Sequence, residues 1–406
     1  MHTAYALPQL NVFYQQHPEQ ARRVTQWQTL ASLCLARWIQ HDDSDDYKWP
    51  ISYSEASWTG LMNTQSCQYE PSVLRLLPEA CCLTLPPLAD FDSFAVSDHT
   101  PSISLRPSYA ARWPLLTVNT RFFLGVGDGA CANVGSKCTT LDRMACTIGT
   151  SAAARVVVPA QQQQQQQQQS SSLSEVPAGL FCYRINHQYL LLGGALTDGG
   201  SVVAWIRELL NIQSDAEMHK CLQEVETLLR QDYEAATHQA NDESTMNDTR
   251  RPLLIMLPFL SGERSTNFQT GATGAWVGLT RATTRARMVK SCLEGVTMRL
   301  AAITRLLPSR AQIWVSGKAL EVNTVWRQMI ADCTGRVVVL DPDTTEGSSR
   351  GVACLVAASL SGQGLIAEPA ASLVETPPRS EGKAYWVKLI RAQERFVDAV
   401  RPIYAA

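Results

Sequence analysis

Hydrophobic periodicity is clearest in the second half of the chain. Apolar residues recur every three or four positions between residues 284 and 307, which predicts a helix with one buried stripe. The segment AQIWV, a helical segment from about residue 323 and the segment RVVVL then predict a strand, a helix and a strand. This alternation favours a parallel sheet flanked by helices, so we expect an α/β fold.

The same pattern predicts further elements on both sides of that unit. Apolar runs predict strands in RFFLGV, in ACTIGTSAAARVVV and in LLIMLPFL, and FCYRI with YLLLGGA is typical of a hairpin. The stretch from residue 83 to 108, rich in Pro, Asp and Ser, predicts irregular chain with short strands. Helices are predicted over about residues 18–40, 201–211, 215–231 and 384–400.

Two polar segments interrupt this pattern. The nine glutamines at residues 161–169 and the serines after them cannot contribute to a core, so we expect a disordered insertion at about residues 160–175. A second polar run, THQANDESTMNDTRRP, predicts a loop at about residues 236–251. A chain of 406 residues is too long for one ordinary core, so two domains are expected.

Composition narrows the function classes. The net charge of −2 provides no general attraction to nucleic acid or to an anionic membrane, so neither is expected as a partner. No apolar run is long enough to span a bilayer, and MHTAYALPQL lacks the pattern of a signal peptide. Twelve cysteines without metal-ligand spacing predict reduced thiols, so we expect a cytoplasmic protein without a zinc site.

The stretch FLGVGDGACANVG, residues 123 to 135, is the first candidate for chemistry. Its apolar start predicts a strand that ends at Val126, which puts Asp128 at the carboxyl end of that strand. Ligands bind at the carboxyl ends of strands in open α/β sheets, where a carboxylate is useful for catalysis. A turn in which Asp128 caps the next helix explains the same residues, and both interpretations stay open.

Glycine-marked turns of this kind recur near four predicted strand ends. They are GVGDGA, TIGTSAA, GGALTDGG at residues 193–200 and VSGKAL at residues 315–320. Together they favour a cleft for a phosphorylated ligand, because a Gly-Thr-Ser turn offers backbone N–H groups and hydroxyls to phosphate oxygens. An ordinary hairpin turn at Gly149-Thr150-Ser151 is the alternative.

In their order, these motifs resemble the FGGY carbohydrate kinases. The resemblance includes GVGDGACANVG followed by TIGTSAAAR, then YLLLGGALTDGGSVVAWIREL and LPFLSGERSTNFQTGATGAWVGLTRATTRARMVKSCLEGV. SGKALEVNTVWRQMIADCTG and EGSSRGVACLVA follow in the family's order. Within the family, TIGTSAAAR, GGALTDGG and WRQMIAD look most like bacterial-type gluconate kinases.

The resemblance implies two actin-like (ribonuclease H-like) domains with a ligand cleft between them. Residues 1–140 would form the C-terminal part of the first, sugar-binding domain, and residues 141–406 the second, nucleotide-binding domain. The implied activity is transfer of the γ-phosphate of ATP, with Mg²⁺, to a hydroxyl of a sugar, sugar acid or polyol. Gluconate is the favoured substrate, with xylulose or ribulose next, and a homo-oligomer is left open.

The resemblance also implies roles for individual residues. Asp128 matches the catalytic base and would contact the substrate, and Tyr5 aligns with an aromatic residue that lines the sugar pocket. No metal-ligating residue is predicted, and we expect Glu263, Arg264 and Glu294 to be structural, with Glu263 and Arg264 anchoring their loop. The residues expected beside the nucleotide are Gly149, Thr150, Gly193, Gly194, Gly200, Gly317, Ala319 and Asn323.

The sequence departs from the family pattern at its front. No Asp-x-Gly-Thr motif is present, so we expect an incomplete first domain and a weak or inactive enzyme in this form. Lys318 replaces a usual glycine and would either crowd the adenine or turn outward and contact phosphate. A non-catalytic relative that binds a nucleotide or a partner is the alternative, and an actin-like ATPase or chaperone is the third interpretation.

Overall fold

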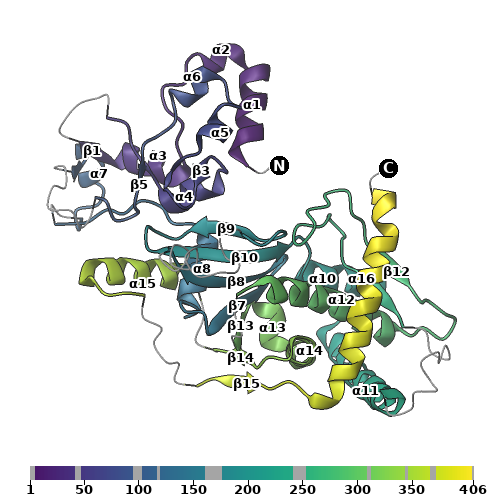
Figure 1. Ribbon diagram of the computed structural model, residues 1–406. Coiled ribbons are helices and arrows are strands. Elements are labelled where there is room, and N and C mark those ends of the chain that lie inside the picture. Colours follow the sequence, from purple (N-terminus) through teal and green to yellow (C-terminus); the bar gives the residue numbers. More distant parts are fainter. Residues whose placement is uncertain are drawn as a thin grey trace, which may run out of the picture.

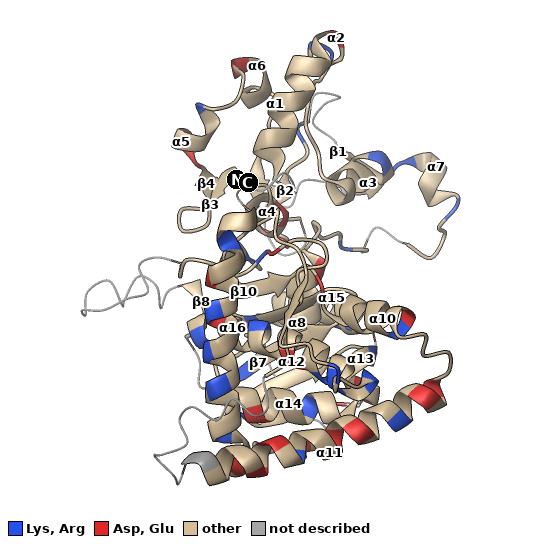
Figure 2. Cartoon of the chain, turned by 90° about the vertical axis from the view of Figure 1, so that its right-hand side faces the viewer, with Lys and Arg blue, Asp and Glu red and all other residues tan. Residues whose placement is uncertain are grey.

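The computed structural model describes residues 5–41, 47–94, 103–116, 119–160, 176–240, 253–308, 312–342, 346–365 and 372–404. The chain forms two lobes, which Figure 1 shows one above the other. We call residues 5–126 the N-terminal lobe and residues 128–404 the sheet lobe. Acidic and basic side chains are interspersed over both, as Figure 2 shows along α11, which agrees with the small net charge.

A single seven-stranded sheet forms the centre of the sheet lobe. The β13–β14 and β13–β7 pairs are parallel, which confirms the predicted strand–helix–strand unit, and the other pairs are antiparallel. The order of the strands is β15 (Val374–Thr376), β14 (Val338–Leu340), β13 (Gln312–Ser316), β7 (Arg143–Ile148), β8 (Ala152–Pro159), β10 (Tyr189–Leu196) and β9 (Phe181–Arg184).

Helices cover both faces of this sheet. The main core lies between one face and a helical layer that includes α12 (Arg285–Leu306), whose predicted apolar stripe is buried. The other face packs against α8 (Asp128–Gly135) and α15 (Gly347–Ser361), as Figure 1 shows. The remaining elements of the lobe are α10 (Gly200–Leu209), α11 (Asp215–Ala240), β11 (Ile255–Leu257), β12 (Ala275–Val277), α13 (Lys318–Val322), α14 (Thr324–Thr334), a 3₁₀ turn (Ser380–Gly382) and α16 (Lys383–Tyr404).

Glycines set the close crossing of α8 and α15. A Cβ built on Gly351 would lie 1.8 Å from the carbonyl oxygen of Cys131, and one on Gly135 would lie 1.8 Å from that of Gly347. Real side chains do not fit at such distances, so the two helices meet backbone to backbone. This crossing places the first residue of α8, Asp128, at a defined position over the sheet.

The N-terminal lobe is built from short elements. Its described strands form only two-stranded sheets, and its apolar residues form small clusters, such as the one around Leu7, Leu61 and Cys81. Its elements are α1 (Ala6–Gln16), α2 (Pro18–Ala21), α3 (Leu30–Trp38), β1 (Ile39–His41), β2 (Ile51–Ser52), α4 (Tyr53–Trp58), β3 (Met62–Asn63), β4 (Gln68–Tyr69), α5 (Pro71–Leu74), α6 (Glu79–Cys82), β5 (Leu88–Ala89), β6 (Ile103–Leu105) and α7 (Pro107–Ala110).

Two predicted elements of the N-terminal lobe are wrong. The segment over residues 18–40 is not one helix, because α2 and α3 are separated by chain whose Trp27 N–H donates to the Thr84 carbonyl, 2.9 Å away. RFFLGV forms no strand, and the Leu124 N–H donates to the Phe91 carbonyl at 2.7 Å. In both places contacts distant in the sequence override the local pattern.

The structure describes only part of the two predicted polar segments. Helix α11 continues to Ala240, so the loop predicted from about residue 236 begins later than expected. Residues 241–252 and the glutamine tract at residues 161–169 lie outside the described residues.

Two findings bear on composition. No helix in the described part of the chain is long and apolar enough to cross a membrane. All twelve cysteines are free, and the reduced state of their thiols stays a prediction.

Candidate active site between the two lobes

Asp128 begins α8 at the point where the chain passes from the N-terminal lobe into the sheet lobe. The residue before it, Gly127, is the N-cap, and a Cβ there would lie 2.2 Å from the ring of Trp58 on α4. The Asp128 side chain is exposed, and its Oδ1 accepts the N–H of Gly129 at 2.6 Å. Asp128 is therefore not the capping residue itself, and its carboxylate is accessible to a ligand.

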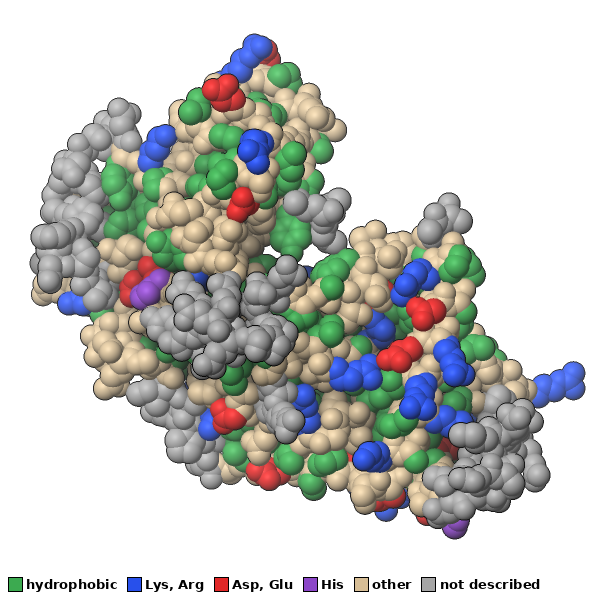
Figure 3. Space-filling view, viewed as in Figure 1, with side chains coloured by type: hydrophobic (Ala, Val, Ile, Leu, Met, Phe, Trp, Pro, Cys, Tyr) green, Lys and Arg blue, Asp and Glu red, His purple; other side chains and the backbone are tan. Residues whose placement is uncertain are grey.

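The predicted sugar-pocket residue Tyr5 lies in an aromatic cluster on this side of the sheet. Its hydroxyl lies 3.5 Å from that of Tyr183 on β9, and the Trp58 ring lies 5.5 Å from the Tyr183 ring, centroid to centroid. Phe181 stacks on Tyr183 at 4.7 Å. The space-filling view in Figure 3 shows a notch between the two lobes, and this cluster brings side chains of both lobes together.

The Gly149-Thr150-Ser151 turn joins β7 to β8 and is held against the start of α10. The Gly149 carbonyl accepts the Gly200 N–H at 2.7 Å, and the Thr150 carbonyl accepts the N–H groups of Gly199 and Ser201 at 2.8 and 3.2 Å. All three turn residues are exposed, and a Cβ on Gly149 would meet nothing within 4 Å. Residues 149–151 thus form a hairpin turn, which was the alternative interpretation. The space at Gly149 is open, as the binding of a phosphate requires.

The predicted nucleotide residues fall into two groups. Gly317, with φ +100°, packs on the carbonyl of Ile148 next to the turn, and Ala319 lies 3.9 Å from the Cβ position of Gly200. Gly317 and Ala319 therefore lie next to the Gly149–Ser151 turn and the start of α10. The residues of the second group have another observed role in the structure.

Three residues belong to that second group. Gly193 and Gly194 lie in mid-strand on β10, where side chains from other elements occupy the Cβ positions. Asn323 is buried as the N-cap of α14, and its Oδ1 accepts the Trp326 N–H at 2.9 Å. Their proposed contact with a nucleotide therefore stays a prediction, with packing and capping as the observed roles.

The sequence did not single out Arg155, which lies near Asp128. Arg155 projects from β8 toward α8, and its guanidinium carbon lies 3.7 Å from the Cβ position of Gly129. Burial lowers the pKa of Arg155, the charge of Asp128 opposes this shift, and the charge of Arg264 adds to it. A single charged residue inside SAAARVVV was the available signal, since a charge in a buried strand needs a reason.

The structural interpretation holds for two of the three charged residues named for it. Glu263 is buried against Arg299 and also accepts the Asn267 amide at 2.9 Å, which confirms its anchoring role. Glu294 is buried with Lys290, and the Lys290 Nζ lies 2.5 Å from its Oε1. Arg264 is different: it is exposed and its side chain makes no hydrogen bond or ion pair with any described residue, so a charge-paired anchor is wrong for it.

Lys318 points away from the turn. It begins α13, its side chain is 84% exposed, and its Nζ lies 3.8 Å from Oε2 of Glu321. The outward orientation, one of the two that were expected, leaves the backbone at Gly317 uncovered by this side chain.

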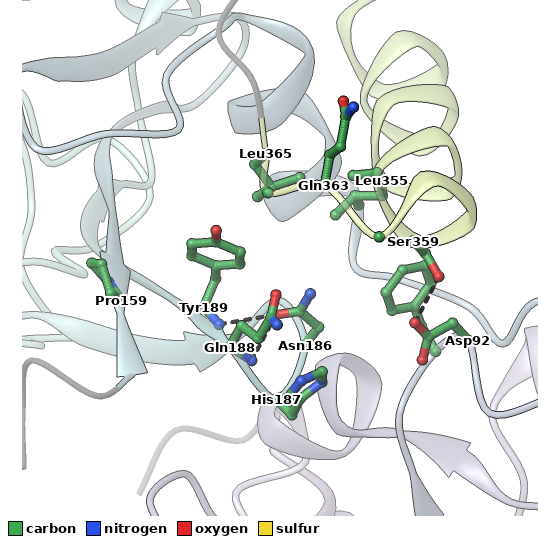
Figure 4. A pocket seen from close by; sticks show the side chains of 14 residues that line it. Asp92, Pro159, Asn186, His187, Gln188, Tyr189, Leu355, Ser359, Gln363 and Leu365 are labelled. Atoms are coloured by element: carbon green, nitrogen blue, oxygen red, sulfur yellow. Dashed lines mark hydrogen bonds between the residues drawn. The ribbon is translucent and has the colours of Figure 1, made fainter. Parts of the chain in front are cut away.

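A separate pocket of about 480 Å³ lies at the far end of β9 and β10, shown in Figure 4. The β9–β10 turn, with Asn186 and His187, forms one wall, and the end of α15 with Ser359 forms another. The Ser359 hydroxyl donates to Asp92 at 2.7 Å across it. None of the predicted site residues lines this pocket, so it is not the predicted active site.

The described residues do not build a dedicated metal site. No group of three or more His, Cys, Asp and Glu side chains among them could hold a metal ion. Mg²⁺ in phosphoryl-transfer sites is usually held by one or two carboxylates together with substrate phosphates. The described side chains therefore do not by themselves define a position for Mg²⁺.

Comparison with solved structures defines the class of fold. The chain aligns over its whole length with xylulose kinase and with gluconate kinase, both from Lactobacillus acidophilus, each with a TM-score of 0.76. The identities are 20% and 21%, and each alignment covers 74% of the solved chain. The fold is thus that of the two-domain actin-like kinases, which confirms the predicted fold class.

The particular family follows from the sequence comparison. The C-terminal domain model of the FGGY family of carbohydrate kinases matches residues 144–360, more than half of the chain, and the chain belongs to this family. Gluconokinase of Bacillus subtilis (strain 168) is 26% identical over 316 residues, which is 75% of this chain and 54% of that protein. Gluconokinase of Bacillus licheniformis is 25% identical over 405 residues, 96% of this chain and 70% of that protein.

Proposed function

We propose that this chain is an ATP-dependent carbohydrate kinase that transfers the γ-phosphate to a hydroxyl of a sugar, sugar acid or polyol. Gluconate is the favoured substrate and xylulose or ribulose come next, since relatives named gluconokinase and xylulose kinase both resemble the chain. The observation that carries the proposal is the accessible carboxylate of Asp128, which follows Gly127 and lies beside an aromatic cluster from both lobes.

Asp128 would act as the general base. Its free oxygen would accept the proton of the attacking hydroxyl, while the oxygen bonded to Gly129 N–H keeps the carboxylate oriented. Tyr5 and the rings near it would hold the carbon chain of the substrate, since ligand pockets combine apolar walls with a few polar groups. Positioning of this kind supplies much of the rate of phosphoryl transfer.

The Gly149–Ser151 turn would hold the phosphates of ATP. The hydroxyls of Thr150 and Ser151 make no hydrogen bond with described residues, both residues are exposed, and the Cβ position of Gly149 is open. Arg155 is four residues from Ser151 along an extended strand, or about 13 Å, so the phosphate chain and the substrate hydroxyl would meet between them. Mg²⁺ bound to the phosphates would neutralise part of their charge.

Substitution of Asp128 tests the proposal. Asp128→Asn keeps the shape and removes the base, so ADP release with gluconate should fall about 10³-fold, because positioned general bases contribute 10²–10⁴-fold. Asp142→Asn is the matched control: its carboxylate is 76% exposed before β7 and makes only a long contact to Arg143, 4.0 Å, so activity should stay unchanged.

The outcomes separate the candidate functions. No ADP release with any sugar, sugar acid or polyol, together with measurable ATP binding, would favour the non-catalytic relative that binds a nucleotide or a partner. Equal ADP release with and without sugar would favour an ATPase. A cytoplasmic location is part of the proposal, supported by the twelve free cysteines, and a homo-oligomer stays a prediction.

A further inference from the structure

Arg155 occupies an unusual place in the sheet. It lies directly opposite Gly193 of β10, and Gly193 in turn lies opposite Phe181 of β9. A Cβ on Gly193 would lie 2.9 Å from Cγ of Arg155 and 3.1 Å from the Phe181 ring. The missing side chain at Gly193 therefore makes room for the arginine stem and the ring, which places the guanidinium beside the aromatic cluster and beside α8.

The charge of this guanidinium is not matched by a protein partner. The Arg155 guanidinium makes no hydrogen bond or ion pair with any residue that the structure describes, and the Arg264 guanidinium, equally unpaired there, adds a second positive charge. Asp128 is close enough to influence Arg155 electrostatically but forms no ion pair with it, so all three groups stay available. Two guanidinium groups beside one carboxylate leave one positive charge in excess, and a half-buried charge is costly without a counterion.

An anion is the ligand that completes such a site, and two sources of it are present in the proposed reaction. The transferred phosphoryl group is one, and the acid group of the substrate is the other. The turn proposed to hold the phosphates is four residues from Arg155 along β8, about 13 Å away. Phe181 of β9, by contrast, lies across Gly193 from Arg155, and its ring stacks on that of Tyr183. This location favours the substrate.

We propose that Arg155, assisted by Arg264, binds the carboxylate of the substrate and so selects sugar acids over neutral sugars and polyols. The inference rests on the proposed kinase function and names the residues that determine its substrate class. The guanidinium of Arg155 donates to the acid group at one end of the substrate, and the carbon chain lies along the aromatic cluster. A hydroxyl remote from the acid group then reaches Asp128.

The test compares D-gluconate with D-glucitol, in which a hydroxymethyl group replaces the carboxylate. In the full chain, Arg155→Met should raise KM for gluconate about 30-fold, as expected for loss of a charged hydrogen bond, with little change in kcat. KM for glucitol should not rise. Arg155→Lys should recover part of the gluconate affinity, because it restores the charge but not the two-pronged geometry.

Two further variants keep the test independent of folding. Arg264 is exposed, so Arg264→Met should fold normally and raise KM for gluconate about fivefold, as expected for an exposed charge pair. Arg230→Met is the matched control on α11, where the arginine is exposed and pairs with Glu226 at 2.9 Å. It should leave KM unchanged for both substrates. Thermal unfolding of each variant shows whether it is folded.

Three outcomes would overturn the inference. Equal loss of kcat with gluconate and glucitol in Arg155→Met would assign Arg155 to the phosphoryl group. An unchanged KM for gluconate in folded Arg155→Met, or in Arg264→Met if the former does not fold, would remove the carboxylate contact. A wild-type chain with equal kcat/KM for glucitol and gluconate would contradict the proposed selectivity.

Calorimetric binding of gluconate and glucitol separates this inference from the proposed function. Gluconate binding that depends on Arg155 without any ADP release would refute the kinase activity and support the carboxylate site. ADP release with neutral substrates only would support the kinase activity and refute the carboxylate site. Neither binding nor turnover of gluconate would refute both.

Discussion

The two lobes of this molecule are built in different ways. The sheet lobe has one seven-stranded sheet with a large core on one face and two helices on the other, whereas the N-terminal lobe has two-stranded sheets and small apolar clusters. The proposed base and phosphate turn belong to the sheet lobe, and Tyr5 and Trp58 come from the other lobe. Groups that need exact placement are thus held by the more continuous core.

Two glutamates, one buried and one half-buried, make the difference concrete. Glu294 of α12 accepts hydrogen bonds from Lys290 and Tyr385, at 2.5 and 2.6 Å. Glu55 of α4 has one carboxylate oxygen that is buried without a hydrogen-bond partner among the described residues. Burial raises the pKa of both carboxyls, but only that of Glu294 is opposed by a neighbouring positive charge. The sheet lobe compensates its buried charge, and the N-terminal lobe does so only in part.

The largest expected effect breaks the close helix crossing of the sheet lobe. In Gly351→Ala the new methyl group would lie 1.8 Å from the Cys131 carbonyl oxygen, so α8 and α15 must separate. We expect a loss of about 4 kcal/mol in the free energy of unfolding, measured by urea denaturation. Gly347→Ala on the same helix is the control: its Cβ position has only ordinary contacts at 3.9 Å, so stability should barely change. Equal effects of the two variants would contradict this account of the crossing.

Removal of the Lys290 charge should have the next largest effect. Lys290→Met leaves Glu294 without its cation, which should cost about 3 kcal/mol near neutral pH. Because burial holds the pKa of Glu294 above its usual 4.5 in the folded state, stability falls as the pH rises through that raised value. The loss should therefore be smallest near pH 4 and largest near pH 8 in chemical denaturation.

A double variant checks the assignment to this pair. Lys290→Met with Glu294→Gln removes both charges, so it should recover most of the lost stability at pH 8. No recovery would mean that the cost arises from Asp232, which also contacts Lys290 at 3.0 Å, or from packing.

The smallest expected effect has the opposite sign and lies in the N-terminal lobe. Glu55→Gln removes a charge that is buried without full compensation, and burial raises the pKa of Glu55 although a hydrogen bond from Thr29 opposes it. The wild-type chain should lose stability as the pH rises above 4.5 through this raised pKa, and the variant should not. Glu55→Gln should thus be stabilised by about 1 kcal/mol at pH 8 and by little at pH 4, measured by thermal unfolding at each pH.

Local patterns predicted much of the sheet lobe. The helix over residues 284–307, the hairpin of β9 and β10, and the β13–α14–β14 unit were all predicted, because each is defined by periodicity within a short stretch. The N-terminal lobe was predicted less well: α1 was missed, and residues 18–40 form two helices. Its elements are too short for periodicity, and distant contacts such as that of Trp27 with Thr84 decide them.

The amino-acid sequence alone determined the family resemblance, the glycine turns and the identity of Asp128, because these depend on residue types at fixed spacing. Only the tertiary structure decided that Arg155, Arg264 and Asp128 lie together, and that Asn323 caps a helix. The reason is physical: the arginines lie more than a hundred residues apart in the chain, and it is strand register and the glycine at position 193 that direct Arg155 toward α8. Local sequence specifies elements, whereas the contacts between elements create the charge arrangement of the site.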